Sequence, residues 1–368
     1  MTYYRSFIEI NRKNLIDNYS KLKALAGDSR FVAVIKANAY GHDSVLIAKT
    51  LNEVGVFNFA VASIDEALVL RKAQVKGEIL LLGYTSKEDL NCAIDNGLTI
   101  SLLDYEYSKD INKQINRKIK AFIQINSGLN RLGYKYDDLE KIKASFKFEN
   151  INIKGIYSHL ASADSDDLKA INYVHQQKTH FDQVLKELKE ANLSYGIASL
   201  QASYGLVNYP HFTYDAVRIG MLLYGVDISE KAYRANSLDL KPVLSLKSHI
   251  IEIQEIKSGE YISYGLAFQA LKPMRIATVS IGYKDGYNRL LAKDNYVLIN
   301  GRYAKIIGKI CMDQLMIDIT DIDCKVDDIV TLIGEDKPIK ADHLASSIDS
   351  ISAELLACLS RHLPRILV

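Results

Sequence analysis

Eight short apolar runs, separated by segments with helical periodicity, constrain the fold of the N-terminal part of this 368-residue chain most strongly. The runs are rich in Val, Ile and Leu, as expected of parallel strands that are buried on both faces. They cover residues 31–37, 58–63, 78–83, 99–104, 120–126, 152–161, 195–203 and 214–225. Because most of the connections are long enough to contain a helix, the pattern predicts an α/β fold, a (β/α)8 TIM-like barrel. A doubly wound open sheet is the alternative.

Helical signals lie between these runs. Apolar residues recur with helical spacing through residues 42–55, and residues 167–192 form the clearest segment of this kind. Ser63 precedes a third segment, and Glu66 follows three residues later, which is the pattern of a capping box. These segments predict helices between the strands.

The pattern changes after residue 235. Runs typical of strands cover residues 244–256, 274–283, 295–310, 315–322 and 327–334, and turn signals such as Asn300-Gly301 separate them. Helical segments return only near the end, at residues 339–348 and 352–362. We therefore expect two domains, a barrel over residues 1–235 and a mostly β C-terminal domain over residues 236–368.

Composition argues against several classes of protein. The formal net charge is only +2, which gives no reason to expect nucleic acid or a membrane surface as partner. No stretch approaches the roughly 18 apolar residues that a membrane-spanning helix needs, and the N-terminus is too polar for a signal peptide. The four cysteines lack the spacing of a metal site or a redox pair. These features are typical of a cytoplasmic protein with reduced thiols and no metal.

Lys36 is the first candidate for chemistry. It follows five apolar residues near the carboxyl end of the first run, and the carboxyl ends of barrel strands face the active site. Partial desolvation there would lower the pKa of the amine and make it nucleophilic. A lysine that ends a strand and points to solvent is the alternative.

The sequence around Lys36 resembles the signature of the alanine racemases. The motif AVIKANAYGH covers residues 33–42, and the resemblance continues in the same order over nearly the whole chain. The further matching segments are residues 127–133, 158–164, 214–225, 262–265, 281–287, 308–320 and 363–365. The resemblance implies a fold-type III isomerase that uses pyridoxal 5'-phosphate (PLP), built from a barrel and a β domain. It also implies a homodimer that supplies a D-amino acid for peptidoglycan.

The resemblance assigns roles to particular residues. Racemisation needs a proton to leave one face of the substrate and to return on the other, so two acid–base groups are the simplest design. The family pattern implies Lys36, which holds PLP, and Tyr264, which reaches the site from the second subunit of a head-to-tail dimer. The substrate would contact Met312 and Tyr283, and Arg131 would bind the substrate carboxylate or the Tyr264 phenolate.

The remaining assignments concern the cofactor. The resemblance places His159 beside the cofactor ring and Arg218 at the pyridine nitrogen. A phosphate group needs hydrogen-bond donors at a strand end or a helix start. The candidates for this group are Tyr40, Ser203, Gly220, Met221 and Arg361.

Four departures from the family pattern concern the site, and one of them is Asn126-Ser127 in place of the usual Asp-Thr, which loses negative charge. Gln124 stands where many members carry a carbamylated lysine, although its amide can still accept one hydrogen bond from Arg131. Ala202 replaces an asparagine, and its surroundings resemble the serine racemases of vancomycin-resistance clusters, which have a membrane domain that this sequence does not include. Arg361 replaces a tyrosine beside the phosphate and the substrate side chain. We therefore expect a racemase of alanine, with serine, or both, as the alternative. A PLP decarboxylase of the same fold and a non-catalytic PLP carrier are weaker alternatives.

Overall fold

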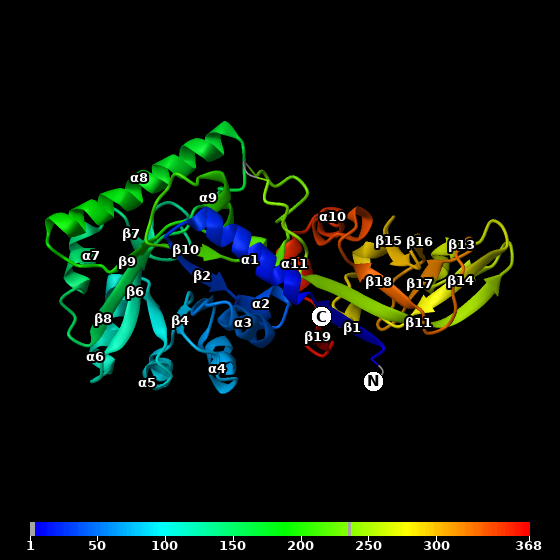
Figure 1. Ribbon diagram of the computed structural model, residues 1–368, viewed down its shortest axis with the longest axis horizontal. Helices are drawn as coiled ribbons and strands as arrows, with labels where there is room; N and C mark the ends of the chain where they lie inside the picture. Colours follow the sequence, from blue (N-terminus) through cyan, green and yellow to red (C-terminus); the bar gives the residue numbers. More distant parts are fainter. Residues whose placement is uncertain (1–3, 235–236) are drawn as a thin grey trace.

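The computed structural model describes residues 4–234 and 237–368 of the chain. It consists of a nearly closed barrel and a second, mostly β domain, which lie end to end along the long axis of the molecule (Figure 1). The predicted fold class is confirmed. The predicted boundary between residues 235 and 236 lies outside the described residues.

Eight parallel strands form the barrel, and each overlaps a predicted run. In sheet order they are β10 (Ala216–Ile219), β2 (Arg30–Val34), β3 (Asn58–Val61), β4 (Glu78–Leu81), β5 (Thr99–Leu102), β6 (Ile119–Asn126), β8 (Ile151–Tyr157) and β9 (Ile197–Ser199). A short β7 (Tyr134–Lys135) pairs with β6. The last strand, β10, pairs with the first, β2, and an isolated bridge joins Ala202 to Arg218 on its other side. This closure rules out the open sheet, in which the first and last strands do not meet.

Helices cover the outside of the barrel (Figure 1). They are α1 (Arg12–Ala26), α3 (Ser44–Glu53), α4 (Ile64–Lys72), α5 (Leu90–Asp95), α6 (Tyr105–Gln114), α7 (Leu139–Ser145), α8 (Leu168–Glu190) and α9 (Ser203–Asn208), with short 3-10 turns η1 (Lys87–Asp89) and η2 (Met221–Tyr224). The Asp167 carboxylate accepts hydrogen bonds from the first turn of α8, which buries Val174, Phe181, Val184 and Leu188. This helical spacing confirms the helix predicted at residues 167–192.

The start of α4 differs from the prediction. Ser63 caps the helix without a side-chain hydrogen bond. The Glu66 carboxylate instead accepts hydrogen bonds from the backbone N–H of Ala62 at 2.8 Å and of Ala37 at 2.6 Å. The predicted capping box is therefore wrong, because the carboxylate binds Ala62 and Ala37 instead of the N–H of Ser63, and the Ser63 hydroxyl does not bind the helix start. Glu66 ties α4 to the segment that follows β2.

The second domain is built on an eight-stranded sheet. Its order is β14 (Met274–Val279), β17 (Leu315–Asp318), β16 (Arg302–Ile307), β15 (Tyr296–Ile299), β18 (Ile329–Ile333), β11 (Leu244–Ile256), β1 (Ser6–Ile10) and β19 (Arg365–Leu367). Smaller elements are β12 (Tyr261–Ile262), β13 (Phe268–Gln269), α10 (Ala341–Ser346), α11 (Ser352–Ala357), η3 (Tyr264–Leu266), η4 (Tyr283–Asp285), η5 (Arg289–Ala292) and η6 (Lys337–Ile339). The strand β1, from the start of the chain, pairs with β11 and was not predicted.

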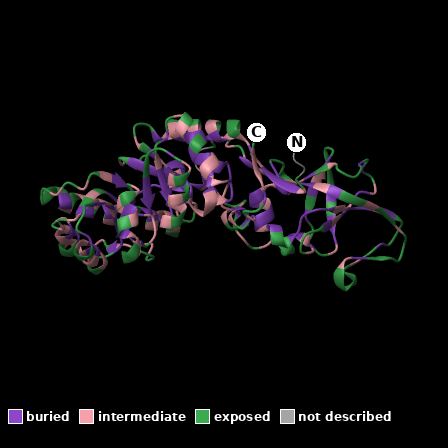
Figure 2. Cartoon of the chain, turned by 90° about the horizontal axis from the view of Figure 1, so that it is seen from below, coloured by how far each residue is buried: buried purple, intermediate pink, exposed green. Residues whose placement is uncertain are grey.

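Buried residues concentrate in the strands of both domains, and exposed residues lie on the outer helices and loops (Figure 2). No described helix combines the length and the apolar composition that crossing a bilayer requires.

Candidate active site

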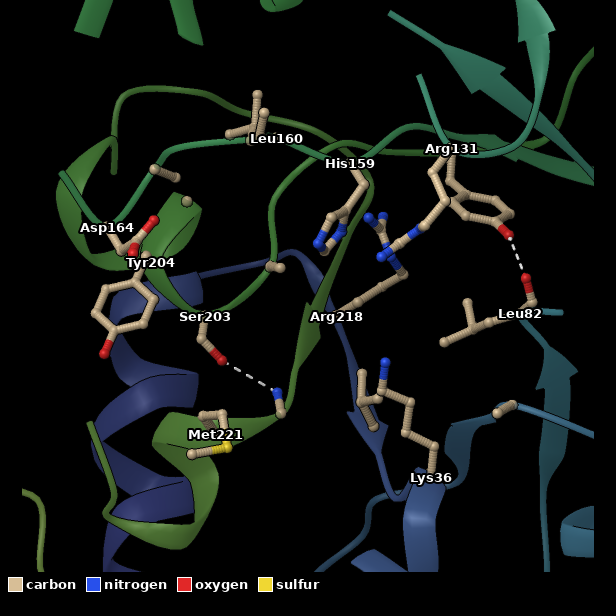
Figure 3. Close-up of a pocket in the computed structure, with 18 of the residues that line it drawn as sticks. Lys36, Leu82, Arg131, His159, Leu160, Asp164, Ser203, Tyr204, Arg218 and Met221 are labelled. Carbon is tan, nitrogen blue, oxygen red and sulfur yellow. Dashed lines mark hydrogen bonds between the residues drawn. The ribbon is translucent and has the colours of Figure 1, made fainter. Parts of the chain in front are cut away.

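A cavity of about 440 Å³ opens at the carboxyl ends of the barrel strands. Figure 3 shows Lys36, Arg131, His159, Ser203 and Arg218 around it, each from a different strand or the segment that follows one. The barrel thus brings together side chains that are far apart in sequence. A concave site with a few convergent polar groups at this end of a barrel is where ligands bind in this architecture.

The segment that begins at Lys36, labelled α2 (Lys36–Tyr40), is a left-handed turn. Ala37, Asn38 and Ala39 have φ between 52° and 55°, and Tyr40 has φ of 52°. A left-handed conformation costs a non-glycine residue roughly 1–2 kcal/mol, so four in succession need support from their surroundings. The barrel strand β2 also ends at Val34, before the end of the predicted run at residue 37.

Residues distant in sequence support this turn. The Glu66 carboxylate binds the N–H of Ala37, and the Arg365 guanidinium donates two hydrogen bonds of 3.1 Å to the carbonyl oxygen of Gly41. A Cβ on Gly41 would lie 2.1 Å from the carbonyl oxygen of Leu356, so α11 packs directly on the end of the turn. Both domains therefore hold the turn in place.

The pKa of the Lys36 amine is lowered, as its position in the sequence predicted. Burial lowers the pKa of its amine, the Arg131 guanidinium lowers it further, and the Glu66 carboxylate opposes both effects. A lower pKa increases the fraction of neutral amine, which is the nucleophilic form.

Arg218 is buried inside the barrel, with 4% of its surface exposed. Its guanidinium donates to the carbonyl oxygen of Ser199 at 2.9 Å, to Ser199 Oγ at 2.6 Å and to the carbonyl oxygen of Ser158. It also lies 5.0 Å from the centre of the Tyr157 ring. Burial lowers the pKa of Arg218 to about 10, so the group stays cationic at neutral pH. Among the described residues no carboxylate forms an ion pair with it.

His159 lies beside this guanidinium in Figure 3. Burial lowers its pKa to about 3, with further contributions from Arg218, Arg131 and Lys36. The imidazole is therefore neutral at neutral pH, whereas its neighbours are cationic groups. Such an excess of positive charge favours an anionic ligand.

Four of the five predicted phosphate-binding residues, Tyr40, Ser203, Gly220 and Met221, line the same cavity. Ser203 Oγ accepts a hydrogen bond of 3.1 Å from the backbone N–H of Gly220 (Figure 3). A Cβ on Gly220 would lie 2.8 Å from the Tyr40 hydroxyl oxygen, so this close approach depends on glycine.

Gln124 has a different partner from the one expected. Its side-chain oxygen accepts a hydrogen bond of 3.0 Å from the Tyr157 hydroxyl, which also lies 2.8 Å from Ser101 Oγ. Within the described part of the chain, Gln124 and Arg131 form no hydrogen bond. The expected contact is therefore absent, although both residues line the cavity.

Tyr264, Tyr283 and Met312 lie in the second domain, away from the cavity of their own chain. All three are exposed, Tyr264 to 73%. The turns that carry them are joined, because Ser263 Oγ accepts a hydrogen bond from the N–H of Lys309 and the carbonyl oxygen of Cys311 accepts one from Tyr283. The structure therefore groups these three residues on one connected set of loops, apart from Lys36.

The predicted residues and the lining of the cavity differ in two ways. Arg361 is exposed and does not line the cavity, so its role toward a cofactor stays a prediction. Tyr157 and Tyr204 line the cavity and were not predicted. The alternation of strand side chains could have found Tyr157, two residues before His159, whereas Tyr204 carries no such signal.

Comparisons with known proteins give one consistent result. The models for the N-terminal and C-terminal domains of alanine racemase match residues 10–227 and 243–367. Alanine racemase 2 of Caldanaerobacter subterraneus subsp. tengcongensis is 35% identical, over 98% of this chain and 94% of that protein. An amino-acid racemase of Enterococcus faecalis is 40% identical over 98% of this chain, which spans only 51% of that protein.

Solved structures agree with these relatives. The alanine racemase of Clostridium difficile 630 superposes with a TM-score of 0.95 at 34% identity, over 100% of this chain and 97% of that one. The alanine racemase of Bacillus anthracis, with bound L-Ala-P, has a TM-score of 0.92 at 31% identity, over 100% of this chain and 96% of that one.

Proposed function

Because the chain belongs to the alanine racemase family, whose members are PLP-dependent isomerases, we propose that it interconverts L- and D-alanine in the cytoplasm. The product D-alanine would serve peptidoglycan synthesis. The observation that carries this proposal is the cavity at the carboxyl ends of the barrel strands, where Lys36, Arg218 and the hydroxyl of Ser203 converge. The barrel domain would span residues 1–235 and the β domain residues 236–368.

The residues around the cavity fit PLP. Ser203, Gly220 and Tyr40 form a close group of donors for a phosphate, because the missing Cβ of Gly220 lets the Tyr40 hydroxyl approach the other two residues. Arg218 would donate to the pyridine nitrogen, and Lys36 would hold the cofactor covalently. PLP, when bound, delocalises the negative charge that forms at the α carbon of an amino acid.

Two groups on opposite sides of the cavity would transfer the proton. Lys36 Nζ would accept or return the α proton on one face, and a lowered pKa increases its neutral, basic form. The hydroxyl of Tyr264 from a second copy of the chain would act on the other face. The guanidinium of Arg131 would hold the substrate carboxylate or stabilise the Tyr264 phenolate, and His159 would stay neutral beside the ring.

This division of roles requires a head-to-tail homodimer. Tyr264, Leu266, Tyr283 and Met312 are exposed large apolar and aromatic side chains on the connected loops of the second domain, and we call them the exposed cluster. Exposed clusters of this kind are typical of interaction sites. We propose that this exposed cluster covers the cavity of a second copy and brings Tyr283 and Met312 to the substrate.

Serine is the second candidate substrate. The 40% identity to a protein named only as an amino-acid racemase leaves the side-chain preference open. Arg361, if it reaches the cofactor region in the dimer, would offer donors to a substrate hydroxyl or bind the phosphate. A PLP decarboxylase would release CO2 instead of inverting the substrate, and a PLP carrier would do neither.

A racemisation assay on a panel of amino acids, with and without added PLP, tests the proposal. We expect inversion to be fastest with alanine and to require PLP, and borohydride to fix the cofactor on Lys36 in peptide maps. Tyr264→Phe should keep bound PLP and slow deuterium exchange in one direction by about 10²–10⁴-fold. The matched variant Tyr303→Phe, at an exposed tyrosine outside the cluster, should leave both directions unchanged. A label on another residue, or equal losses in both directions, would contradict the assignments.

A further inference from the structure

A second cavity, of about 270 Å³, lies at the amino ends of the barrel strands, at the opposite end from the candidate active site. The strand register places residues of this end side by side, with Ala216 opposite Arg30 and Asn58 opposite Glu78. Its apolar lining consists of Val32, Phe59, Leu80, Phe122, Ile197 and Ala216. Layers of side chains usually fill the interior of such a barrel, so a hollow here departs from the ordinary architecture.

An irregularity in β8 adds a cation to the rim of this cavity. Along the pairing of β6 with β8, Ala121 lies opposite Ile153 and Phe122 opposite Gly155, so Lys154 is an extra residue. A bulge of this kind redirects a side chain, and Lys154 lines the cavity. The neighbouring Gly155 admits the Phe122 ring, since a Cβ there would lie 2.3 Å from Phe122 Cε2.

The charges at the rim do not balance. Glu78 pairs with Lys120 at 2.8 Å. The side chains of Arg30 and Lys154 form no ion pair or hydrogen bond with any other residue that the structure describes, and the same holds for the buried hydroxyl of Thr99. Arg30 and Lys154 are exposed and Thr99 is buried, all three line the hollow with apolar walls, and two of the three are cations.

Arg218 connects this cavity to the candidate active site, because it lines both. Its guanidinium donates to the carbonyl oxygen and the hydroxyl of Ser199, and Ser199 also lines the second cavity. A molecule in the second cavity would therefore contact residues that set the position of the Arg218 guanidinium.

We propose that the second cavity binds a small monocarboxylate with an apolar body. We further propose that a ligand in this cavity alters the position of the Arg218 guanidinium. The carboxylate pairs with Arg30, whose guanidinium suits a bidentate contact, and with Lys154. The apolar body lies against Leu80 and Phe122, where it removes apolar surface from water. The volume lies below the range of pockets for drug-sized ligands, which suits a small molecule. The binding site is independent of the proposed function, whereas the effect on a cofactor rests on it.

Benzoate, titrated into the holoenzyme and followed by saturation-transfer NMR, tests the site. Benzyl alcohol has the apolar ring of benzoate without its negative charge, and inorganic phosphate has negative charge without an apolar ring. Each should bind at least roughly tenfold more weakly than benzoate. Arg30→Gln combined with Lys154→Gln should weaken benzoate binding by about tenfold or more while PLP content stays constant. Lys147→Gln combined with Lys169→Gln, which removes two exposed cations elsewhere on the barrel, is the matched control and should bind benzoate like the parent.

The outcomes separate the two parts of the proposal. Benzoate that alanine displaces, or that binds the Arg30→Gln, Lys154→Gln protein as well as the parent, lies in the other cavity and overturns the site. Absence of binding at millimolar benzoate overturns it as well. A change in the visible absorption of bound PLP as benzoate saturates the protein supports the effect on Arg218, and an unchanged spectrum overturns that effect. If the protein binds no PLP, the proposed function fails while the NMR result still decides the site.

Discussion

The fully buried ring of His42 shows how the environment of one residue sets its charge. It stacks on Tyr224 with ring centres 4.4 Å apart, and its Nδ1 donates to the carbonyl oxygen of Ala39 at 2.9 Å. Burial lowers its pKa to about 4. The unfolded chain binds a proton at this residue near pH 6.5, whereas the folded protein does so only near pH 4. The free energy of unfolding should therefore fall as the pH decreases through this window, by on the order of 3 kcal/mol for His42.

The variant His42→Gln tests this dependence, because it keeps a donor for the Ala39 carbonyl but does not titrate. We expect urea unfolding at about pH 7 and about pH 4.5 to show a smaller loss of stability in the variant than in the parent. The exposed His362 supplies the control, since His362→Gln should follow the parent. An equal loss in all three proteins would show that His42 does not carry the effect.

At the scale of elements, the left-handed turn α2 depends on a carboxylate from α4. The two hydrogen bonds from Ala37 and Ala62 to Glu66 are charge-assisted, and such bonds contribute roughly 1.5–3 kcal/mol each. Glu66→Gln replaces one acceptor oxygen with a donor, so it loses one of them. We expect lower stability in urea, by about 1–3 kcal/mol, and faster release of PLP, since the turn carries both Lys36 and Tyr40.

The neighbouring Asp65 supplies a matched control. It lies in the same first turn of α4 and is exposed, and Asp65→Asn removes the same charge without touching α2. Both variants weaken the favourable interaction of the helix N-terminus with negative charge. Only the difference between them reports on the turn, and equal stability and equal PLP release would rule out a positioning role for Glu66.

At the scale of the whole molecule, the separation of Lys36 from Tyr264 predicts that a single chain does not contain a complete active site. Lys36 lines the barrel cavity, whereas Tyr264 lies on the exposed cluster of the second domain. If a dimer shares its sites, mixing inactive Lys36→Ala and Tyr264→Phe proteins creates heterodimers with one intact site. Random exchange should then restore up to about a quarter of the parent activity.

The control for this experiment mixes Lys36→Ala with Lys36→Gln, which lack the same group and should restore no activity. Subunit exchange is verified separately, with differently tagged chains. Exchange without any recovery in the Lys36→Ala and Tyr264→Phe mixture would mean that the two residues do not share a site.

Local sequence patterns were enough to predict the eight barrel strands, the long helix α8 and several residues at one end of the barrel. Apolar runs and helical spacing are local signals, and they persist wherever the segments are packed. Lys36, His159 and Arg218 could be placed near one another because each lies at or just beyond the carboxyl end of a strand, and these ends share one face.

The contacts between distant segments could not be predicted in this way. No local pattern predicts four left-handed residues after β2, because their support comes from Glu66 and Arg365, far away in sequence. The same holds for the pairing of β1 with β11 and for the bulge at Lys154 in β8. Each of these features depends on which groups satisfy one another's hydrogen bonds and fill one another's space after folding, and neither spacing nor composition encodes that choice.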